Sequence, residues 1–176
     1  MKIVLVFVST LDGKVTKWGD PVVKRWSSQE DKDYFRKTMS DSKLIVMGSN
    51  TFNAEPMKPS EKHMIIVMTR HPSDYKEKHV PGQIEFTDES PAQIVERFRN
   101  GVYEIMHVVG GPKVATSFLK AQLVDELWLT IEPKIFGKGD ILVSHDLLDI
   151  ELKMIMYEKV NEQGTLITKY EVVKKY

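Results

Sequence analysis

The sequence predicts an α/β fold in three layers (α/β/α), with helices on both faces of a mixed, mostly parallel sheet. Two observations predict it. Continuous apolar runs, typical of strands buried on both faces, alternate with helix-start patterns along most of the chain. The last part alternates apolar and polar residues instead, which is typical of an antiparallel hairpin. We expect one domain over residues 1–176, a length that suits a single domain with a substantial core.

The first half of the chain contains three apolar runs and one helix-start pattern. Residues 3–8 form a continuous apolar run, which predicts a strand buried on both faces. The segment Ser27-Ser28-Gln29-Glu30 has the form of a capping box, so we expect a helix from there to about Met39. The short runs 44–47 and 64–68 predict two further buried strands.

The second half continues the alternation. The segment Ser90-Pro91-Ala92-Gln93 places a cap, a proline and a glutamine in the order that opens a helix, expected to run through Phe98. A strand at 105–109, a helix at 112–120 and a strand at 126–131 follow.

The end of the chain has a different periodicity. Residues 152–158 and 166–173 alternate apolar and polar side chains, and the turn-forming segment 161–164 separates them. This pattern predicts an antiparallel hairpin at the end of the sheet.

Two of the expected strands end in glycine. The strand at 105–109 runs into Gly110 and Gly111, and Pro112 then suits the first turn of a helix. The strand at 44–47 runs into Gly48. Glycine lets backbone N–H groups approach a phosphate, and a helix N-terminus favours an anion. Two such turns at one sheet edge would suit a dinucleotide, although neither the Rossmann G-x-G-x-x-G pattern nor a P-loop occurs.

Composition excludes several classes of function. The formal net charge is zero, so we expect no nucleic-acid or anionic-membrane partner. Cysteine is absent, which excludes disulfides, thiolate zinc sites and cysteine nucleophiles. The five histidines show no helical ligand spacing, so no metal site is expected. No apolar run has transmembrane length, and we expect a cytoplasmic protein that acts on a small molecule.

Several short motifs, taken in order, resemble a known superfamily. They are Ser9-Thr10-Leu11-Asp12-Gly13-Lys14-Val15, Asp31 with Phe35, Met47-Gly48-Ser49-Asn50-Thr51-Phe52, Val108-Val109-Gly110-Gly111 and Val124-Asp125-Glu126-Leu127. Together they resemble the dihydrofolate-reductase-like superfamily, and most closely the reductase domain of the bacterial riboflavin-biosynthesis deaminase-reductase. The chain departs from that branch at Val109, where an acid is common, and from dihydrofolate reductases at Ser49, where a basic residue is common.

The resemblance implies an NADPH-dependent reductase of a small heterocyclic substrate. The first expectation is 5-amino-6-(5-phosphoribosylamino)uracil, and the runner-up is dihydrofolate or another pterin. An alternative of another class is a nucleotide-binding protein without catalytic activity. A carboxylate facing the cleft would favour the reductase, because a pure binding protein has no need of one.

The resemblance also implies which residues meet the cofactor and the substrate. The expected cofactor-binding residues are Thr10, Asp12, Gly13, Gly48, Ser49, Thr51, Thr69, Arg70, Gly110, Gly111 and Lys113. The expected substrate-binding residues are Lys14, Trp26 and Phe35. Two plainer interpretations stay open: Asp12-Gly13 is a strong turn dipeptide, and Arg70, whose fork matches a ribose phosphate, could be an ordinary surface arginine.

Asp31 is the expected catalytic residue. It lies in the first turn of the helix that begins near Ser27, and it shares a face with Phe35 four residues later. By resemblance, a carboxylate here orients or protonates the substrate. The plainer interpretation is that an acid in a first turn is favoured by the helix dipole.

We also expect a homodimer. The strand at 125–128 and the C-terminal hairpin would leave sheet edges exposed, and long apolar edges invite pairing. Reductases of the riboflavin branch are typically dimers.

Overall fold

The structure, a computed structural model, describes residues 1–144 and 147–173. The described residues form one eight-stranded sheet with four α-helices and two 3-10 segments. The strands are β1 (Lys2–Thr10), β2 (Leu44–Gly48), β3 (Met64–Met68), β4 (Ile84–Thr87), β5 (Ile105–Val108), β6 (Glu126–Glu132), β7 (Glu151–Lys159) and β8 (Leu166–Val173). The helical segments are η1 (Val23–Arg25), α1 (Gln29–Asp41), α2 (Ser49–Ala54), η2 (Pro72–Lys78), α3 (Pro91–Arg99) and α4 (Pro112–Lys120).

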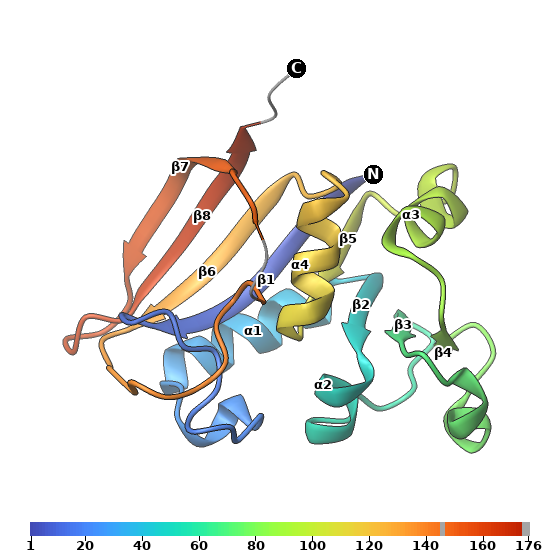
Figure 1. Ribbon diagram of the computed structural model, residues 1–176, viewed down its shortest axis with the longest axis horizontal. Helices are drawn as coiled ribbons and strands as arrows, with labels where there is room; N and C mark the ends of the chain where they lie inside the picture. Colours follow the sequence, from blue (N-terminus) through green and yellow to red (C-terminus); the bar gives the residue numbers. More distant parts are fainter. Residues whose placement is uncertain (145–146, 174–176) are drawn as a thin grey trace.

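The sheet has the strand order β4-β3-β2-β5-β1-β6-β8-β7. Neighbours from β4 to β6 pair in parallel, whereas β6·β8 and β7·β8 pair antiparallel. Figure 1 shows this hairpin extending the sheet beyond β6. The predicted mixed sheet with a C-terminal antiparallel hairpin is therefore confirmed.

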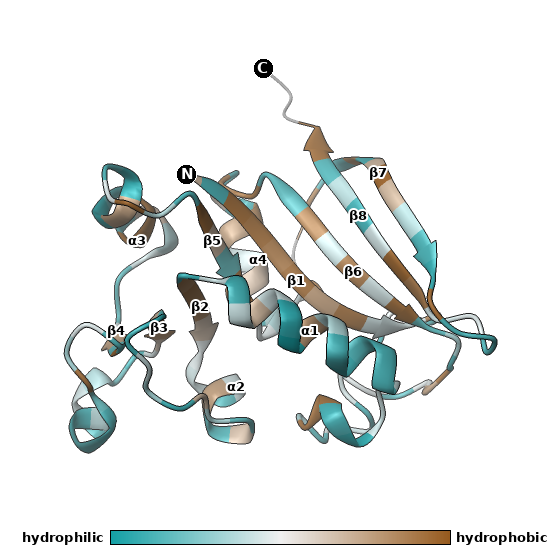
Figure 2. Cartoon of the chain, turned by 180° about the vertical axis from the view of Figure 1, so that it is seen from behind, coloured by the Kyte–Doolittle hydropathy of each residue, from teal (hydrophilic) through white to brown (hydrophobic). Residues whose placement is uncertain are grey.

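Helices cover both faces of the parallel part. Figure 1 shows α4 in front of the central strands, and Figure 2, seen from behind, shows α1 crossing the other face. The alternation within β2 explains why its run is wholly apolar. Leu44 and Val46 belong to the larger core cluster, while Ile45 and Met47 belong to the cluster on the opposite face.

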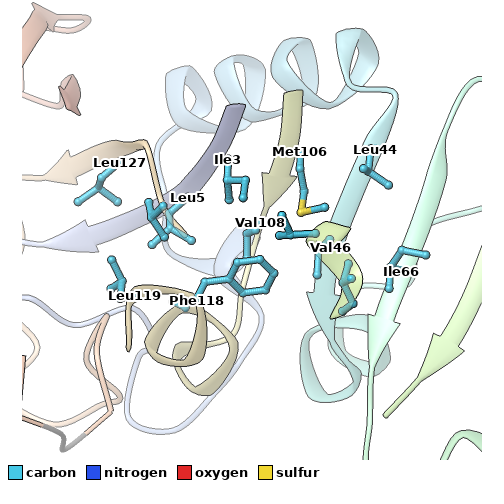
Figure 3. Close-up of a cluster of buried hydrophobic side chains, with 14 of the residues drawn as sticks. Ile3, Leu5, Leu44, Val46, Ile66, Met106, Val108, Phe118, Leu119 and Leu127 are labelled. Carbon is cyan, nitrogen blue, oxygen red and sulfur yellow. The ribbon is translucent and has the colours of Figure 1, made fainter. Parts of the chain in front are cut away.

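The larger core lies between the sheet and helices α3 and α4. In Figure 3 the Phe118 ring of α4 lies beside Val108, with Leu5, Val46 and Leu119 around it. Phe118 and Val108 are both fully buried. This packing holds α4 against β5, and so it sets the position of the turn that joins them.

Some local predictions need correction. The helix at 29–41 is capped by Ser28, whose Oγ accepts from the N–H of Asp31, and not by Ser27 as the capping-box pattern indicated. The Ser90 capping box is present as expected. Helix α2 and strand β4 were missed because both are short, and β4 has only two apolar residues, Ile84 and Phe86.

The prediction that the strand at 125–128 forms an exposed edge of the sheet is also wrong. Strand β6 lies inside the sheet between β1 and β8, because the hairpin folds back and β8 pairs along it from Glu126 to Ile131. The free edge on this side of the sheet is β7.

Candidate functional site

A cleft of about 1400 Å³ lies at the carboxyl ends of the parallel strands. Strands β2 and β5 are neighbours there, but the chain leaves β2 toward β3 on one side and leaves β5 toward β6 on the other. Such a switch point is where open α/β sheets bind ligands, because the two departing connections leave a crevice between them.

The two glycine turns meet at the centre of this cleft. The N–H of Gly48 donates to the carbonyl oxygen of Gly110 at 2.8 Å. Gly110 has φ of +123°, a conformation open to glycine, and its peptide bond to Gly111 is cis. The two glycine-ended strands thus meet at one sheet edge, which is the arrangement that would suit a dinucleotide.

A side chain at either turn would crowd its neighbours. A Cβ at Gly111 would lie 3.2 Å from Thr51 Oγ1, and a Cβ at Gly48 would lie 3.1 Å from a methyl group of Val114. The wall of the cleft is therefore main chain at this point. Helix α4 begins directly after Gly111, and no side chain caps it. Its first N–H groups and its positive dipole end suit a phosphate, so these residues fit a dinucleotide cofactor.

The remaining expected cofactor residues of the cleft lie around these turns. Ser49 and Thr51 belong to α2, Thr69 and Arg70 follow β3, and Lys113 stands in the first turn of α4; all of them line the cleft. Arg70 and Lys113 are exposed cations. Such side chains suit the phosphates of a nucleotide.

Asp31 lines the same cleft from α1. It is only 5% exposed. Burial raises the pKa of the Asp31 carboxyl above its ordinary value, the hydroxyls of Thr130 and Ser27 lower it in part, and the negative charge of Glu132 raises it. A carboxyl with a raised pKa retains its proton to higher pH, which is the property that a general acid requires.

The face of α1 next to Asp31 is aromatic. Phe35 lies one turn further along and lines the cleft, as predicted, and it also packs against the smaller core cluster. Tyr34 lines the cleft as well, and burial raises the pKa of its hydroxyl to about 12, so it stays neutral. A flat apolar wall beside a buried acid suits a planar heterocycle.

Five expected site residues are not among those that line the cleft. Thr10, Asp12, Gly13 and Lys14 form a turn after β1, with Gly13 at φ of +73° and Lys14 N–H donating to Thr10 Oγ1. Trp26 is buried, and its ring meets Phe136 edge to face at a centroid distance of 5.1 Å.

The Asp12 carboxylate instead joins two loops. It accepts from the N–H groups of Phe136 and Gly137, at 3.2 and 2.8 Å, and from Thr10 Oγ1 at 2.5 Å. These bonds, that of Thr10 foremost, lower the pKa of Asp12. The structure thus supports the turn interpretation of Asp12-Gly13, and the loop after β1 is tied to the loop after β6.

No local pattern in the sequence indicated the polar residues around Asp31. Ser27 precedes α1 and Thr130 lies on β6, yet both line the cleft beside it. The period of two in β6 could have placed Thr130 on the same face as Trp128. Only the sheet order shows that this face of β6 lies against α1.

Two classes of feature are not found in the part of the chain that the structure describes. Residues 1–144 and 147–173 hold no group of three or more histidine, aspartate or glutamate side chains placed to bind a metal. None of their helices is both long and apolar enough to cross a membrane.

Comparison with solved structures shows the same fold in reductases. A pyrimidine reductase-like protein of Corynebacterium diphtheriae superimposes with a TM-score of 0.79 at 18% identity, over 99% of this chain and 92% of its own. A deaminase/5-amino-6-(5-phosphoribosylamino)uracil reductase of Thermotoga maritima gives 0.73 at 18% identity, over 97% of this chain and 56% of its own. Dihydrofolate reductase of Enterococcus faecalis, complexed with NADP(H), gives 0.67 at 19% identity, over 97% and 94%.

The fold is therefore dihydrofolate-reductase-like, as predicted. The match to a sequence family is more specific, because it extends from the first strand into β8. Over residues 1–166 the sequence matches the RibD C-terminal domain, and the chain belongs to that family of reductases.

Proposed function

We propose that the protein is an NADPH-dependent reductase of a small heterocyclic substrate, with 5-amino-6-(5-phosphoribosylamino)uracil as the first substrate to test. One observation carries the proposal. A single cleft is lined by two joined glycine turns, at Gly48 and Gly110, and by a buried acid, Asp31. A reductase needs both a nucleotide site and a proton-handling group, and the cleft offers both.

The glycine turns and the start of α4 would hold the cofactor's phosphates. At these glycines the cleft is lined by main chain without Cβ atoms, and no side chain caps the start of α4. Arg70 would meet a ribose phosphate, and this role supports NADPH over NADH. When bound, the nicotinamide supplies a hydride.

Asp31 would supply the proton. Reduction of a C=O or C=N bond adds a hydride to carbon and a proton to oxygen or nitrogen. The Asp31 carboxyl stands in the cleft wall with its pKa raised by burial. It can therefore hold a proton for the heteroatom, and Thr130 would orient the carboxyl through its hydroxyl.

The family and the shape of the site support the proposed substrate class. The Corynebacterium protein named above is pyrimidine reductase-like and the Thermotoga protein is a 5-amino-6-(5-phosphoribosylamino)uracil reductase, and Phe35 and Tyr34 offer a flat wall for a pyrimidine ring. Dihydrofolate is the second candidate, because the carboxyl on α1 resembles the substrate-contacting carboxylate of dihydrofolate reductases.

The test is an NADPH oxidation assay with each candidate substrate in turn. We expect consumption of NADPH with the ribosylamino-pyrimidine and much slower consumption of NADH. Faster turnover of dihydrofolate would favour the second candidate. A thermal shift with NADPH but no turnover of any heterocycle would favour a nucleotide-binding protein without catalytic activity.

We further propose that the protein is a homodimer formed through β7. This strand is the edge of the sheet and is exposed along most of its length. Met154, Ile155 and Tyr157 expose 48%, 48% and 72% of their surface. An apolar edge strand of this kind can pair with another strand. In a two-fold dimer, β7 of one copy would pair with β7 of the other.

A further inference from the structure

A second buried acid lies beneath the start of α1. Glu132 is the last residue of β6 and is 1% exposed. The N–H of Ser28 donates to its Oε1 at 2.6 Å, and Thr165 Oγ1 donates to its Oε2 at 2.9 Å. Both oxygens act as acceptors, which suits the ionised carboxylate. The ion pairs formed by residues 1–144 and 147–173 do not include Glu132, and a buried charge without a cation is rare in proteins.

The contacts of Glu132 join the hairpin to the helix that carries Asp31. Ser28 caps α1, and its Oγ accepts from the N–H of Asp31. On the other side, Asn161 in the hairpin turn donates to Thr165 Oγ1 at 2.9 Å and to Glu30 Oε2 at 3.1 Å. The end of β6 and the turn between β7 and β8 therefore hold the first turn of α1 from two sides.

The charged and titratable groups around Asp31 come from two elements. Helix α1 contributes Lys32, whose positive charge lowers the pKa of Asp31, and the neutral hydroxyl of Tyr34. Strand β6 contributes the negative charge of Glu132, which raises the pKa of Asp31. Lys32 lies at the cleft wall, where water screens it more than the fully buried Glu132.

We propose that Glu132 is a positioning residue for Asp31: its buried carboxylate holds Ser28 and with it the first turn of α1, which carries Asp31. The inference rests on the proposed function, because there Asp31 supplies the proton for reduction. Without Glu132, Asp31 would lose its proton at a lower pH and would be a poorer acid near neutrality.

The first test is a pH titration of the Asp31 carboxyl by carbon-detected NMR, without substrate or cofactor. Glu132→Gln keeps an acceptor for Ser28 N–H and removes the charge. We expect the midpoint of Asp31 to fall, because the negative charge of Glu132 raises the pKa of the Asp31 carboxyl. Asp33→Asn is the control, because it removes an exposed acid of the same helix that is paired with Arg36, and it should leave the midpoint unchanged. An equal midpoint in wild type and Glu132→Gln would overturn the proposal.

Glu132→Asp provides a second test if the glutamine variant does not fold. The shorter side chain keeps the charge but withdraws it from α1. The midpoint of Asp31 should fall partway, and the amide of Ser28 should exchange with solvent roughly tenfold faster. If both quantities keep their wild-type values, the proposal is wrong.

Turnover supplies an independent readout. The alkaline limb of the pH–turnover profile should move to lower pH in Glu132→Gln by the amount seen in the titration. The titration and the amide exchange need no substrate, so they decide on Glu132 even if the proposed reduction is not found. Conversely, an Asp31 variant could lose turnover while Glu132→Gln leaves the titration midpoint of Asp31 unchanged. That result would support the proposed function and contradict the role of Glu132.

Discussion

The N–H of Gly48 donates a hydrogen bond to the carbonyl oxygen of Gly110, and this bond joins the ends of two neighbouring strands. Because Thr51 Oγ1 and Val114 also press on these turns, a side chain at either position would have to displace its neighbours. Glycine at these positions leaves main chain along the cleft and avoids that crowding.

Gly111→Val should abolish most of the stabilisation by NADPH. A ligand present at about a hundred times its Kd stabilises the folded state by about 2.7 kcal/mol, which would raise the Tm of a chain of this length by roughly 5–10 °C. The valine side chain would fill the approach to the backbone, so the shift should nearly vanish in a thermal-shift assay.

The matched control is Gly101→Val. Gly101 also has a close neighbour, with a Cβ expected 3.3 Å from the carbonyl oxygen of Phe98, but it does not line the cleft. This variant should keep the full NADPH shift. Equal shifts in both variants would argue against a phosphate site at the glycine turns.

Asp31→Asn should lower turnover by at least about tenfold, since general acid catalysis contributes typically 10²–10⁴-fold. NADPH affinity should change little, because the glycine turns are untouched. Wild-type turnover should decline as pH rises through the pKa of Asp31, and the variant should lack this decline. Steady-state kinetics and a cofactor titration measure both, with Asp33→Asn, an exposed acid paired with Arg36, as the control. Normal turnover in Asp31→Asn would leave Asp31 as an acid favoured only by the helix dipole.

The same variant should be more stable than wild type at neutral pH. The pKa of Asp31 is raised on folding by burial, so its favourable contribution exists at low pH and is lost as pH rises through the folded pKa. Asparagine removes that penalty. Urea denaturation should show a higher midpoint for Asp31→Asn at pH 7, and the difference should shrink in acid. A less stable variant at pH 7 would show that the carboxylate makes a net favourable contribution there.

His107 should make the fold sensitive to acid. Its ring is buried and accepts or donates one hydrogen bond with Ser42 Oγ at 2.8 Å. Burial, with a smaller effect from Lys169, lowers the pKa of His107 from 6.5 to about 4. Stability is therefore present above pH 6.5 and lost as pH falls through 4, by up to about 3 kcal/mol.

His107→Gln should flatten this dependence in urea denaturation between pH 7 and pH 4, because glutamine keeps a hydrogen-bonding group without titrating. The exposed His71 is the control, and His71→Gln should keep the wild-type slope. Retention of that slope in His107→Gln would assign the acid sensitivity to another group.

The β7 interface predicts a particle of twice the 20.3 kDa chain mass in light scattering. Ile155→Lys places a charge in the exposed edge and should shift the mass toward that of one chain. Val102→Lys, at a position 84% exposed in a loop away from the hairpin, should leave the dimer intact. A wild-type mass near 20 kDa would reject the homodimer.

Local patterns in the sequence were sufficient for most of the fold. The runs at β2 and β3 are apolar at every position because both faces of the central sheet are covered, and that can be read without a structure. The Ser90 cap and the hairpin turn at 161–164 were predicted for similar reasons, since the signals are local. The short elements β4 and α2 had too few residues to show a period.

The candidate site was only partly accessible to the same reasoning. Gly48, Gly110 and Asp31 could be singled out because glycine-ended strands and a first-turn acid carry a local signature. Their meeting in one cleft depended on the strand order, in which β2 and β5 are neighbours although 56 residues of chain separate Gly48 from Ile105. The surroundings of Asp31 depended even more on the strand order. Thr130 and Glu132 lie about a hundred positions further along the chain, and only the pairing of β6 between β1 and β8 brings them beneath α1. The sequence by itself therefore determined which residues were candidates for catalysis and binding, because side-chain identity and local periodicity can be read from it directly. Burial and neighbouring charge, which decide the protonation of Asp31, arise between distant segments and exist only in the folded chain.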